Sequence, residues 1–220
     1  MKYKFFLLII STALTGQLCL GQAILQDPVS ARTFNSDKYT DVKGTPFLYD
    51  KWIKGNVKVK QGTYQGLELK LDLYENTLFF NRNDNSYAFE EDVMDFVLMP
   101  KPNDSSTYQY FTKGLSASSL KPQQYVQVLA RGKLGFYRSD IKNMSDMNEI
   151  NRGRVKTFTT SVRYFVEESG TLKMIKLTKD EILSFMKDKE AEVNSYINEH
   201  KLSFKKEADI AAIFSYYNTL

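Results

Sequence analysis

The chain has very little of the side-chain chemistry on which most enzymes and metal sites depend. Among 220 residues there is one cysteine, Cys19, and one histidine, His200. No His-Glu-x-x-His, paired-cysteine or EF-hand spacing occurs, and neither a Gly-x-Ser-x-Gly elbow nor a phosphate-binding glycine loop is present. We therefore expect no catalytic motif, no metal and no cofactor, and we expect His200 to lie in solvent near the C-terminus of a helix.

Strong charge and long apolar runs are also lacking. The formal net charge is +4, from 30 Lys and Arg against 26 Asp and Glu. Such an even balance does not favour nucleic acid or an anionic membrane as partner. After the first 23 residues no segment is apolar for long enough to cross a bilayer, so we expect no transmembrane segment in the mature chain.

Residues 1–23 have the pattern of a signal peptide. Lys2 and Lys4 give a basic start, an apolar stretch follows, and Gly21-Gln22-Ala23 offers small residues where a signal peptidase reads. The pattern predicts cleavage after Ala23 and an exported protein, in the periplasm, on the outer surface or in the medium. Two alternatives stay open: a retained membrane anchor, and a lipoprotein acylated at Cys19 after cleavage before that residue.

Cleavage after Ala23 removes the only cysteine and two lysines. The mature chain then has no disulfide, and its net charge becomes 28 minus 26, or +2. A chain of this length buries on the order of 70% of its unfolded surface, so its core is large enough to hold it together unaided.

What the chain does have is aromatic residues, with 15 Phe and 14 Tyr, and one strongly patterned stretch at residues 55–80. In GNVKVKQGTYQGLELKLDLYENTLFF, leucine alternates with polar residues between positions 67 and 74. A period of two predicts a strand with one apolar and one polar face. Gln61-Gly62 and Glu75-Asn76 favour turns on either side, and Gly55-Asn56 favours a bulge, so this stretch is predicted to be the centre of an antiparallel meander.

The rest of the chain predicts an α+β fold. Residues 24–46 are expected to be a flexible leader or an extended arm, and 47–220 a single domain that is mainly β to 177 and mainly α from 178. The sheet is expected to be antiparallel and meander-rich, with about eight to ten strands and a possible curl into a partial barrel. Residues 139–154 are polar and are predicted to be a long mobile loop.

Two or three short C-terminal helices are expected to pack on this sheet. Thr178 and Glu181 have the spacing of a capping box, in which each side chain satisfies a backbone N–H of the other residue. Apolar residues then recur at helical spacing in three segments. They are Ile182, Leu183, Phe185 and Met186; Val193, Tyr196 and Ile197; and Ile210, Ile213, Phe214 and Tyr217.

This combination resembles small exported proteins of the Bacteroidota that form uncharacterised families. The resemblance rests on the signal ending in GQA, the meander stretch, VLARGKLGFYRSD and the tail YINEHKLSFKKEADIAAIFSYYN. It covers most of the mature chain and implies an envelope or secreted location. It carries no catalytic motif and supplies no activity.

A few residues remain as site candidates. The acidic residues Glu90, Glu91, Asp92 and Asp95 could pair as hydrolytic carboxylates, since two carboxylates about 5 to 9 Å apart can hydrolyse a glycosidic bond, although acidic clusters are common on exposed turns. A calcium site that uses Asp84, Glu90 or Asp92 is a further alternative.

Two other pairs are candidate ligand contacts. Tyr49 and Trp52 could form a platform on which a sugar stacks, or could belong to the core. Arg152 and Arg154 make the 139–156 segment basic, so it could touch anionic lipid or glycan headgroups, or simply be solvated.

These observations favour a non-enzymatic exported protein that binds or scaffolds in the cell envelope, with an envelope protein, lipid, peptide or glycan as possible partner. One alternative is a hydrolase of unfamiliar type that uses the carboxylates between positions 90 and 95. The other is a subunit of a surface assembly, which predicts an exposed apolar patch or an unpaired sheet edge.

Overall fold

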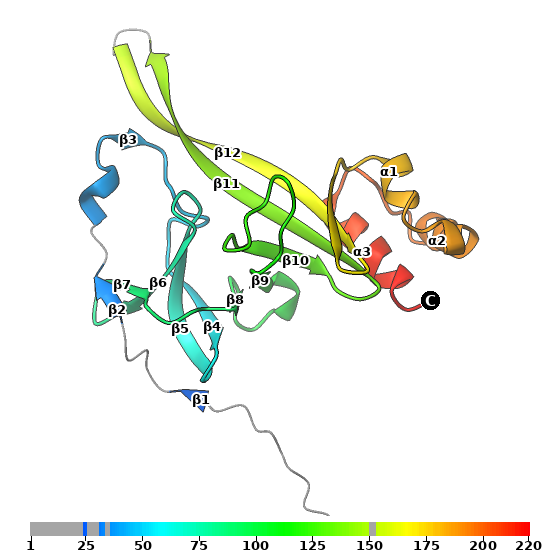
Figure 1. Ribbon diagram of the computed structural model, residues 1–220, viewed down its shortest axis with the longest axis horizontal. Helices are drawn as coiled ribbons and strands as arrows, with labels where there is room; N and C mark the ends of the chain where they lie inside the picture. Colours follow the sequence, from blue (N-terminus) through cyan, green and yellow to red (C-terminus); the bar gives the residue numbers. More distant parts are fainter. Residues whose placement is uncertain (1–23, 26–30, 34–35, 150–152) are drawn as a thin grey trace, which may run out of the picture.

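The computed structural model describes residues 24–25, 31–33, 36–149 and 153–220, which form a mostly β protein with three short α-helices (Figure 1). Eleven strands follow one another in the order β13-β12-β11-β10-β9-β8-β4-β5-β6-β7-β2, and β1 and β3 pair off this path. The end strands β13 and β2 do not pair with each other in the described chain, so the sheet is open. It has more strands than predicted and is mixed, because β1 and β3 pair in parallel.

The strands are β1 (Ile24–Leu25), β2 (Ala31–Thr33), β3 (Val42–Lys43), β4 (Ile53–Val59), β5 (Gly62–Asp72), β6 (Thr77–Arg82), β7 (Asn85–Phe89), β8 (Asp95–Leu98), β9 (Gln109–Thr112), β10 (Val126–Ala130), β11 (Leu134–Glu149), β12 (Gly153–Glu168) and β13 (Thr171–Ile175). The helices are α1 (Lys179–Leu183), α2 (Glu190–Glu199) and α3 (Glu207–Tyr217), with 3₁₀ turns η1 (Ser36–Tyr39), η2 (Ser105–Thr107) and η3 (Lys187–Lys189).

The predicted meander at residues 55–80 is confirmed as β4, β5 and β6, which lie inside the sheet between β8 and β7. Leu69 and Leu71 are buried, and Leu67 and Leu73 pack partly buried against the same core. The predicted bulge is present as a register shift between Gly55 and Val57. The sequence pattern was sufficient here because one face of the strand is buried and the other is largely not.

One residue of the polar face departs from this pattern. Asp72 was expected to face solvent with Lys70 and Tyr74, but it is fully buried. Phe47 bridges to Asp72 and covers that end of β5, and the Tyr39 hydroxyl donates to the Asp72 carboxylate. The segment that precedes the meander therefore closes over its polar face.

Residues 24–46, expected to be a flexible leader or an extended arm, contain three short strands that pair with distant parts of the sheet. β1 pairs in parallel with β5, β2 pairs with the edge of β7, and β3 pairs in parallel with β12 at Lys156 and Thr157. Pro46, which ends the segment, is buried. The predicted signal peptide, its cleavage site after Ala23, and Cys19 lie outside the described residues.

The prediction of a long mobile loop at residues 139–154 is wrong. Its described residues belong to β11 and β12, which pair one to one from Leu134↔Glu168 to Glu149↔Gly153. The outer half of this hairpin extends away from the rest of the protein (Figure 1). Because little of it is buried against a core, its sequence shows no apolar alternation, and the backbone ladder alone makes it a strand pair.

The three helices and their apolar stripes are confirmed. Ile182, Met186, Val193, Ile210 and Phe214 are fully buried in one cluster with Phe136 and Val166 of the hairpin. The capping box is half formed: the Thr178 hydroxyl accepts from the Glu181 N–H at 3.4 Å, but the Glu181 carboxylate accepts from Lys176 instead of Thr178. The helices cover the end of the sheet that is opposite the hairpin tip (Figure 1).

Candidate functional site

A groove of about 520 Å³ lies where three parts of the sheet meet. Its walls are the β5–β6 turn, the segment between β9 and β10, and the middle of the β11–β12 hairpin. Its lining comprises nine polar or charged residues, one tyrosine and four aliphatic residues. They are Asn76, Ser118, Ser119, Lys121, Gln123, Gln124, Asn143, Ser161 and Arg163; Tyr74; and Leu73, Ala117, Leu120 and Ile141.

Side chains of the lining join the walls to one another. Asn76 donates through Nδ2 to the Gln123 carbonyl at 2.7 Å and accepts the Tyr125 N–H at 2.9 Å. Gln124 Nε2 donates to the hydroxyl of the buried Ser139 at 2.9 Å. Arg163 Nη1 donates to the Ser119 carbonyl at 2.9 Å. These bonds connect segments far apart in sequence, so the groove is formed before any ligand arrives.

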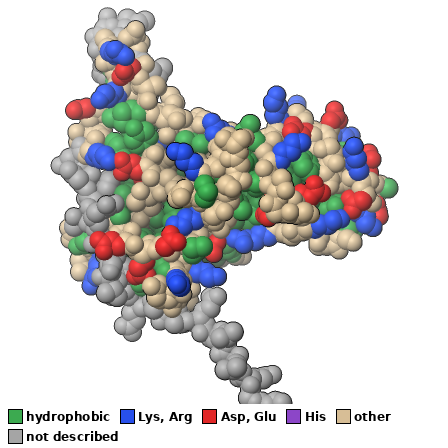
Figure 2. All heavy atoms as spheres, viewed as in Figure 1, with side chains coloured by type: hydrophobic (Ala, Val, Ile, Leu, Met, Phe, Trp, Pro, Cys, Tyr) green, Lys and Arg blue, Asp and Glu red, His purple; other side chains and the backbone are tan. Residues whose placement is uncertain are grey.

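The charged side chains that line the groove are all positive. Lys121 and Arg163 line it, and no carboxylate does. Neither cation takes part in a salt bridge within the described chain. On the face of the molecule drawn in Figure 2, basic and acidic side chains are interspersed. A local excess of positive charge without carboxylates favours a neutral or anionic ligand over a cationic one.

The rim of the groove is connected to an aromatic cluster that holds the hairpin. The Tyr74 ring, 41% exposed, meets Phe158 of β12 at 5.4 Å between centroids, and Tyr39 packs edge-on against both rings. Below them Asp72 accepts the main-chain N–H groups of Tyr74 and Glu75, each at 2.8 Å. This cluster fixes the turn that forms one wall.

Burial changes the ionisation of the two polar groups in this cluster. It raises the pKa of the Asp72 carboxyl, although the N–H groups of Glu75 and Tyr74 oppose the shift by favouring the ionised form. Burial also raises the pKa of the Tyr39 hydroxyl, and the negative charge of Asp72 adds to the effect. Both groups thus favour their protonated, uncharged forms more than they would in water.

The structure distributes the four predicted carboxylates among different surroundings. Glu91 lines a hollow of about 210 Å³ and accepts the Tyr64 hydroxyl at 2.6 Å, while its Oε2 is buried without a partner among the described residues. Asp95 lines another hollow, of about 180 Å³, 3.9 Å from Arg131. Asp92 pairs with Lys113, and Glu90 is exposed. The hydrolase hypothesis, which needs two of them in one site, stays a prediction.

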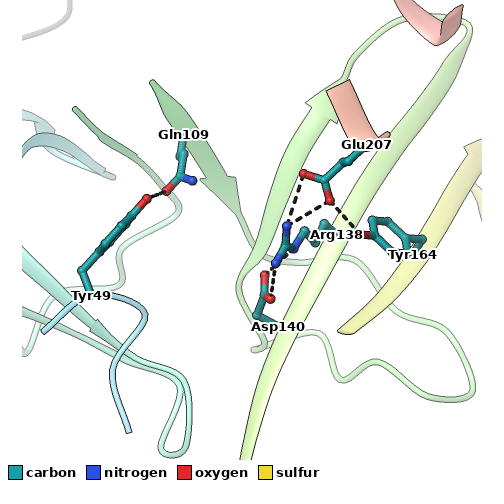
Figure 3. Close-up of polar contacts among 6 residues, drawn as sticks. All are labelled: Tyr49, Gln109, Arg138, Asp140, Tyr164 and Glu207. Carbon is teal, nitrogen blue, oxygen red and sulfur yellow. Dashed lines mark hydrogen bonds and ion pairs between the residues drawn. The ribbon is translucent and has the colours of Figure 1, made fainter. Parts of the chain in front are cut away.

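The predicted aromatic pair is divided between two environments. Tyr49 packs on the core of the sheet, and its hydroxyl donates to Gln109 Oε1 at 2.9 Å (Figure 3). The Trp52 ring lies 5.6 Å from the ammonium of Lys70, which also donates to the Asp50 carbonyl at 2.6 Å. Both side chains are partly buried, and neither lines the polar groove.

Of the two basic candidates, Arg154 lies at the far end of the hairpin. Arg154 pairs with Asp146 across the two strands at 2.8 Å, and its side chain is 75% exposed. Arg152 lies outside the described residues. His200 is exposed at the C-terminal end of α2, as predicted, with its Nδ1 3.1 Å from the Tyr196 carbonyl. Neither Arg154 nor His200 lines the groove.

An ionic cluster that sequence analysis did not identify joins the hairpin to α3 (Figure 3). The Arg138 guanidinium binds Asp140 with two hydrogen bonds of 2.8 Å, and Glu207 accepts from both Arg138 and the Tyr164 hydroxyl. Arg138 and Asp140, two apart in one strand, were a detectable signal, but Glu207 comes from 67 residues further along the chain. All four side chains satisfy one another, so the cluster is best explained as structural.

Comparison with known proteins identifies no relative. No family model matches the chain, and neither a curated protein nor a solved structure does. In the described part of the chain, no helix has the length and apolar character needed to cross a membrane. Among the same residues, no group of three or more His, Cys, Asp and Glu is arranged to hold a metal ion.

Proposed function

We propose that this chain is an exported, non-enzymatic binding protein of the cell envelope, and that its groove takes a hydroxyl-rich ligand of the oligosaccharide class, neutral or anionic. The observation that carries the proposal is the lining of the groove. Its amide, hydroxyl and guanidinium groups, beside four aliphatic side chains, offer both donors and acceptors, as the hydroxyls of a sugar require.

The same lining argues against the lipid alternative. Lipid chains need an apolar enclosure, whereas nine of the groove's lining residues are polar or charged. The inside of the sheet offers no such enclosure in the clusters described, because large side chains fill it: Phe80 packs against Phe89, and Phe96 stacks on Phe111, each at 4.7 Å between ring centroids. Export is supported by the signal pattern of residues 1–23.

Isothermal titration calorimetry with two defined oligosaccharides tests the proposal. The probes are a galacturonate tetrasaccharide, which carries carboxylates, and a neutral glucose tetrasaccharide of the same length. We expect saturable binding of at least one, and tighter binding of the galacturonate at low salt because of Lys121 and Arg163. Absence of saturable binding for both up to about 10 mM would overturn the proposal.

Matched variants locate the binding. Lys121→Ala removes one groove cation, and it is expected to weaken galacturonate binding about three- to tenfold with little effect on the neutral sugar. Lys101→Ala makes the same change in net charge at an exposed position outside the groove and should leave both affinities unchanged. Equal losses in the two variants would mean that net charge, and not the groove, governs binding.

A further inference from the structure

The outer edge of β12 is interrupted. At one end Thr157 is the last residue that pairs with β3, and at the other end Tyr164 is the first that pairs with β13. Between them residues 158–163 have a partner only on the β11 side among the described residues. Six residues of strand span about 20 Å, which leaves a slot between two strands that already use this edge.

The direction of the free backbone groups follows from one hydrogen bond on the opposite side of the hairpin. The Lys142 N–H donates to the Leu73 carbonyl at 3.4 Å and therefore points away from β12. Lys142 lies directly opposite Thr160, so this is a pair whose backbone groups point outward on both strands. The N–H and C=O of Thr160 consequently face the slot, and by the period of two so do those of Val162.

The residues that carry these outward backbone groups are exposed to solvent, as expected of an accessible strand edge. Thr160 is exposed, and Val162 is 41% exposed, one of the few large apolar side chains with such exposure. Natural edge strands are commonly protected by proline, bulges or inward-pointing charges. Residues 158–163 contain no proline, and their register with β11 has no shift. Neither proline nor a bulge therefore protects this part of the edge, and its one charged side chain is Arg163, at the end of the slot.

The strands β3 and β13, which flank the slot, limit which partners can bind in it. A second copy would have to bring its own β12 with β3 and β13 still attached, and these would collide in the plane of the sheet with the same strands of the first copy. An isolated extended segment has no such obstacle. Adding a strand to a free edge in this way is a common mode of peptide recognition.

Charge indicates the chemistry of that segment. The charged side chains nearest the slot on the strands that border it are cations, Lys43 in β3 and Lys156 and Arg163 in β12. Lys173 of β13 and the acids Glu167 and Glu168 of β12 lie further along, beside the β12–β13 turn. We propose that the edge of β12 at residues 158–163, between β3 and β13, binds an extended acidic segment of another protein as an additional strand. The backbone groups of Thr160 and Val162 supply the hydrogen bonds, and the surrounding cations select the acidic side chains.

A designed peptide tests the proposal on the full mature chain. The probe is a fluorescein-labelled heptapeptide in which Glu alternates with Val, followed by fluorescence anisotropy. We expect saturable binding, at least about tenfold weaker binding of a peptide with Lys in place of Glu, and loss of binding when alternate peptide nitrogens are methylated. On binding, the Thr160 and Val162 amides should become protected from hydrogen exchange.

Proline variants locate the site. Thr160→Pro and Val162→Pro each remove an outward N–H that makes no bond to β11, so the ladder should survive while the peptide affinity falls about tenfold. Val162→Thr keeps the N–H and should bind like the wild type. Circular dichroism establishes that the variants are folded, and the methylated peptide still decides the question if a proline variant is not.

Three outcomes would overturn the inference. The first is the absence of saturable binding up to about 1 mM, and the second is equal binding of the methylated peptide. The third is self-association of the protein that the proline variants abolish, because that result would assign the edge to a second copy. The slot shares Ser161 and Arg163 with the groove, whereas Lys121 lies in the groove alone. Lys121→Ala should leave peptide binding unchanged, and failure of either proposal can therefore be told from failure of the other.

Discussion

Arg138 donates through Nη1 to both carboxylate oxygens of Glu207, at 3.2 and 3.0 Å, and so joins the middle of the long hairpin to the first turn of α3. The other edge of the same guanidinium holds Asp140, whose side chain is 7% exposed. Glu207 also lies where the helix dipole favours a negative charge. One arginine thereby fixes how the helices are placed on the sheet, and each partner depends on the others to remain satisfied.

Removal of the Glu207 carboxylate should therefore destabilise the protein measurably. Glu207→Ala leaves the Tyr164 hydroxyl without its acceptor and Arg138 with Asp140 as its remaining partner, and we expect a loss of about 2–3 kcal/mol in the free energy of unfolding from urea titration. Glu199→Ala, an exposed acid at the end of α2, is the control and should change stability by less than about 0.5 kcal/mol. Similar losses in both variants would contradict the structural role given to the cluster.

The Tyr164 hydroxyl in this cluster predicts that the stability of the protein depends on pH in the alkaline range. Burial, followed by its hydrogen bond to Glu207, raises the pKa of Tyr164 to about 12, against an ordinary value of 10.0. A group whose pKa is raised by folding stabilises the fold below its unfolded pKa, and that contribution is lost as the pH rises through the folded value. The stability advantage of the wild type over Tyr164→Phe should therefore be full below pH 10 and should shrink between pH 10 and about 12.

Comparison of the two proteins isolates this contribution. Other tyrosines with raised pKa values, such as Tyr125 and Tyr137, are common to both proteins, so their effects cancel in the difference. Urea unfolding monitored at steps of pH gives the difference directly. A constant difference across this range would show that folding does not raise the pKa of Tyr164.

The buried Asp72 carboxyl predicts that stability also depends on pH in the acidic range. Because burial raises its pKa above 3.8, the fold favours the protonated carboxyl, and its stabilising contribution is present at low pH and lost as the pH rises through the folded value. Asp72→Asn imitates the protonated form and keeps an oxygen for the Tyr74 and Glu75 N–H groups. We expect this variant to be more stable than the wild type at pH 7, with the difference closing as the pH falls toward 4.

An exposed aspartate provides the control for this prediction. Asp41→Asn removes the same charge at a position in solvent and should not reproduce the pH-dependent difference. Thermal unfolding at several pH values is a sufficient measurement. If Asp72→Asn proved less stable than the wild type at every pH, the N–H groups that favour the ionised carboxylate would outweigh burial.

The sequence predicted the parts of this protein in which one face of an element is buried. The meander and the three helical stripes were both visible as local patterns. The outer half of the β11–β12 hairpin was not, because without a buried face the period of two disappears from its sequence. The groove was also invisible, since Asn76, Gln124 and Arg163 meet only through pairings between distant strands.

One position of the meander, Gly55, has no room for a side chain. Gly55 lies beside the bulge in β4, and an added Cβ would lie 2.3 Å from the Val97 carbonyl oxygen of β8 and 2.5 Å from Leu69 Cδ1 of β5. Leu69 can change its rotamer, but the Val97 carbonyl is main chain in a neighbouring strand of the sheet and cannot move without disturbing the β4–β8 pairing. The close approach, and not a positive φ, is what requires glycine here.

Gly55→Ala should therefore destabilise the protein by about 1–3 kcal/mol in urea unfolding, the usual range for overpacking a core position. The exposed neighbour Lys54→Ala is the control and should have little effect. Hydrogen exchange should show the loss first at the β4–β8 ladder, while the helical cluster around Ile210 and Phe214 remains protected, because it does not contact this strand. Uniform loss of protection would instead mean that the two clusters unfold as one unit.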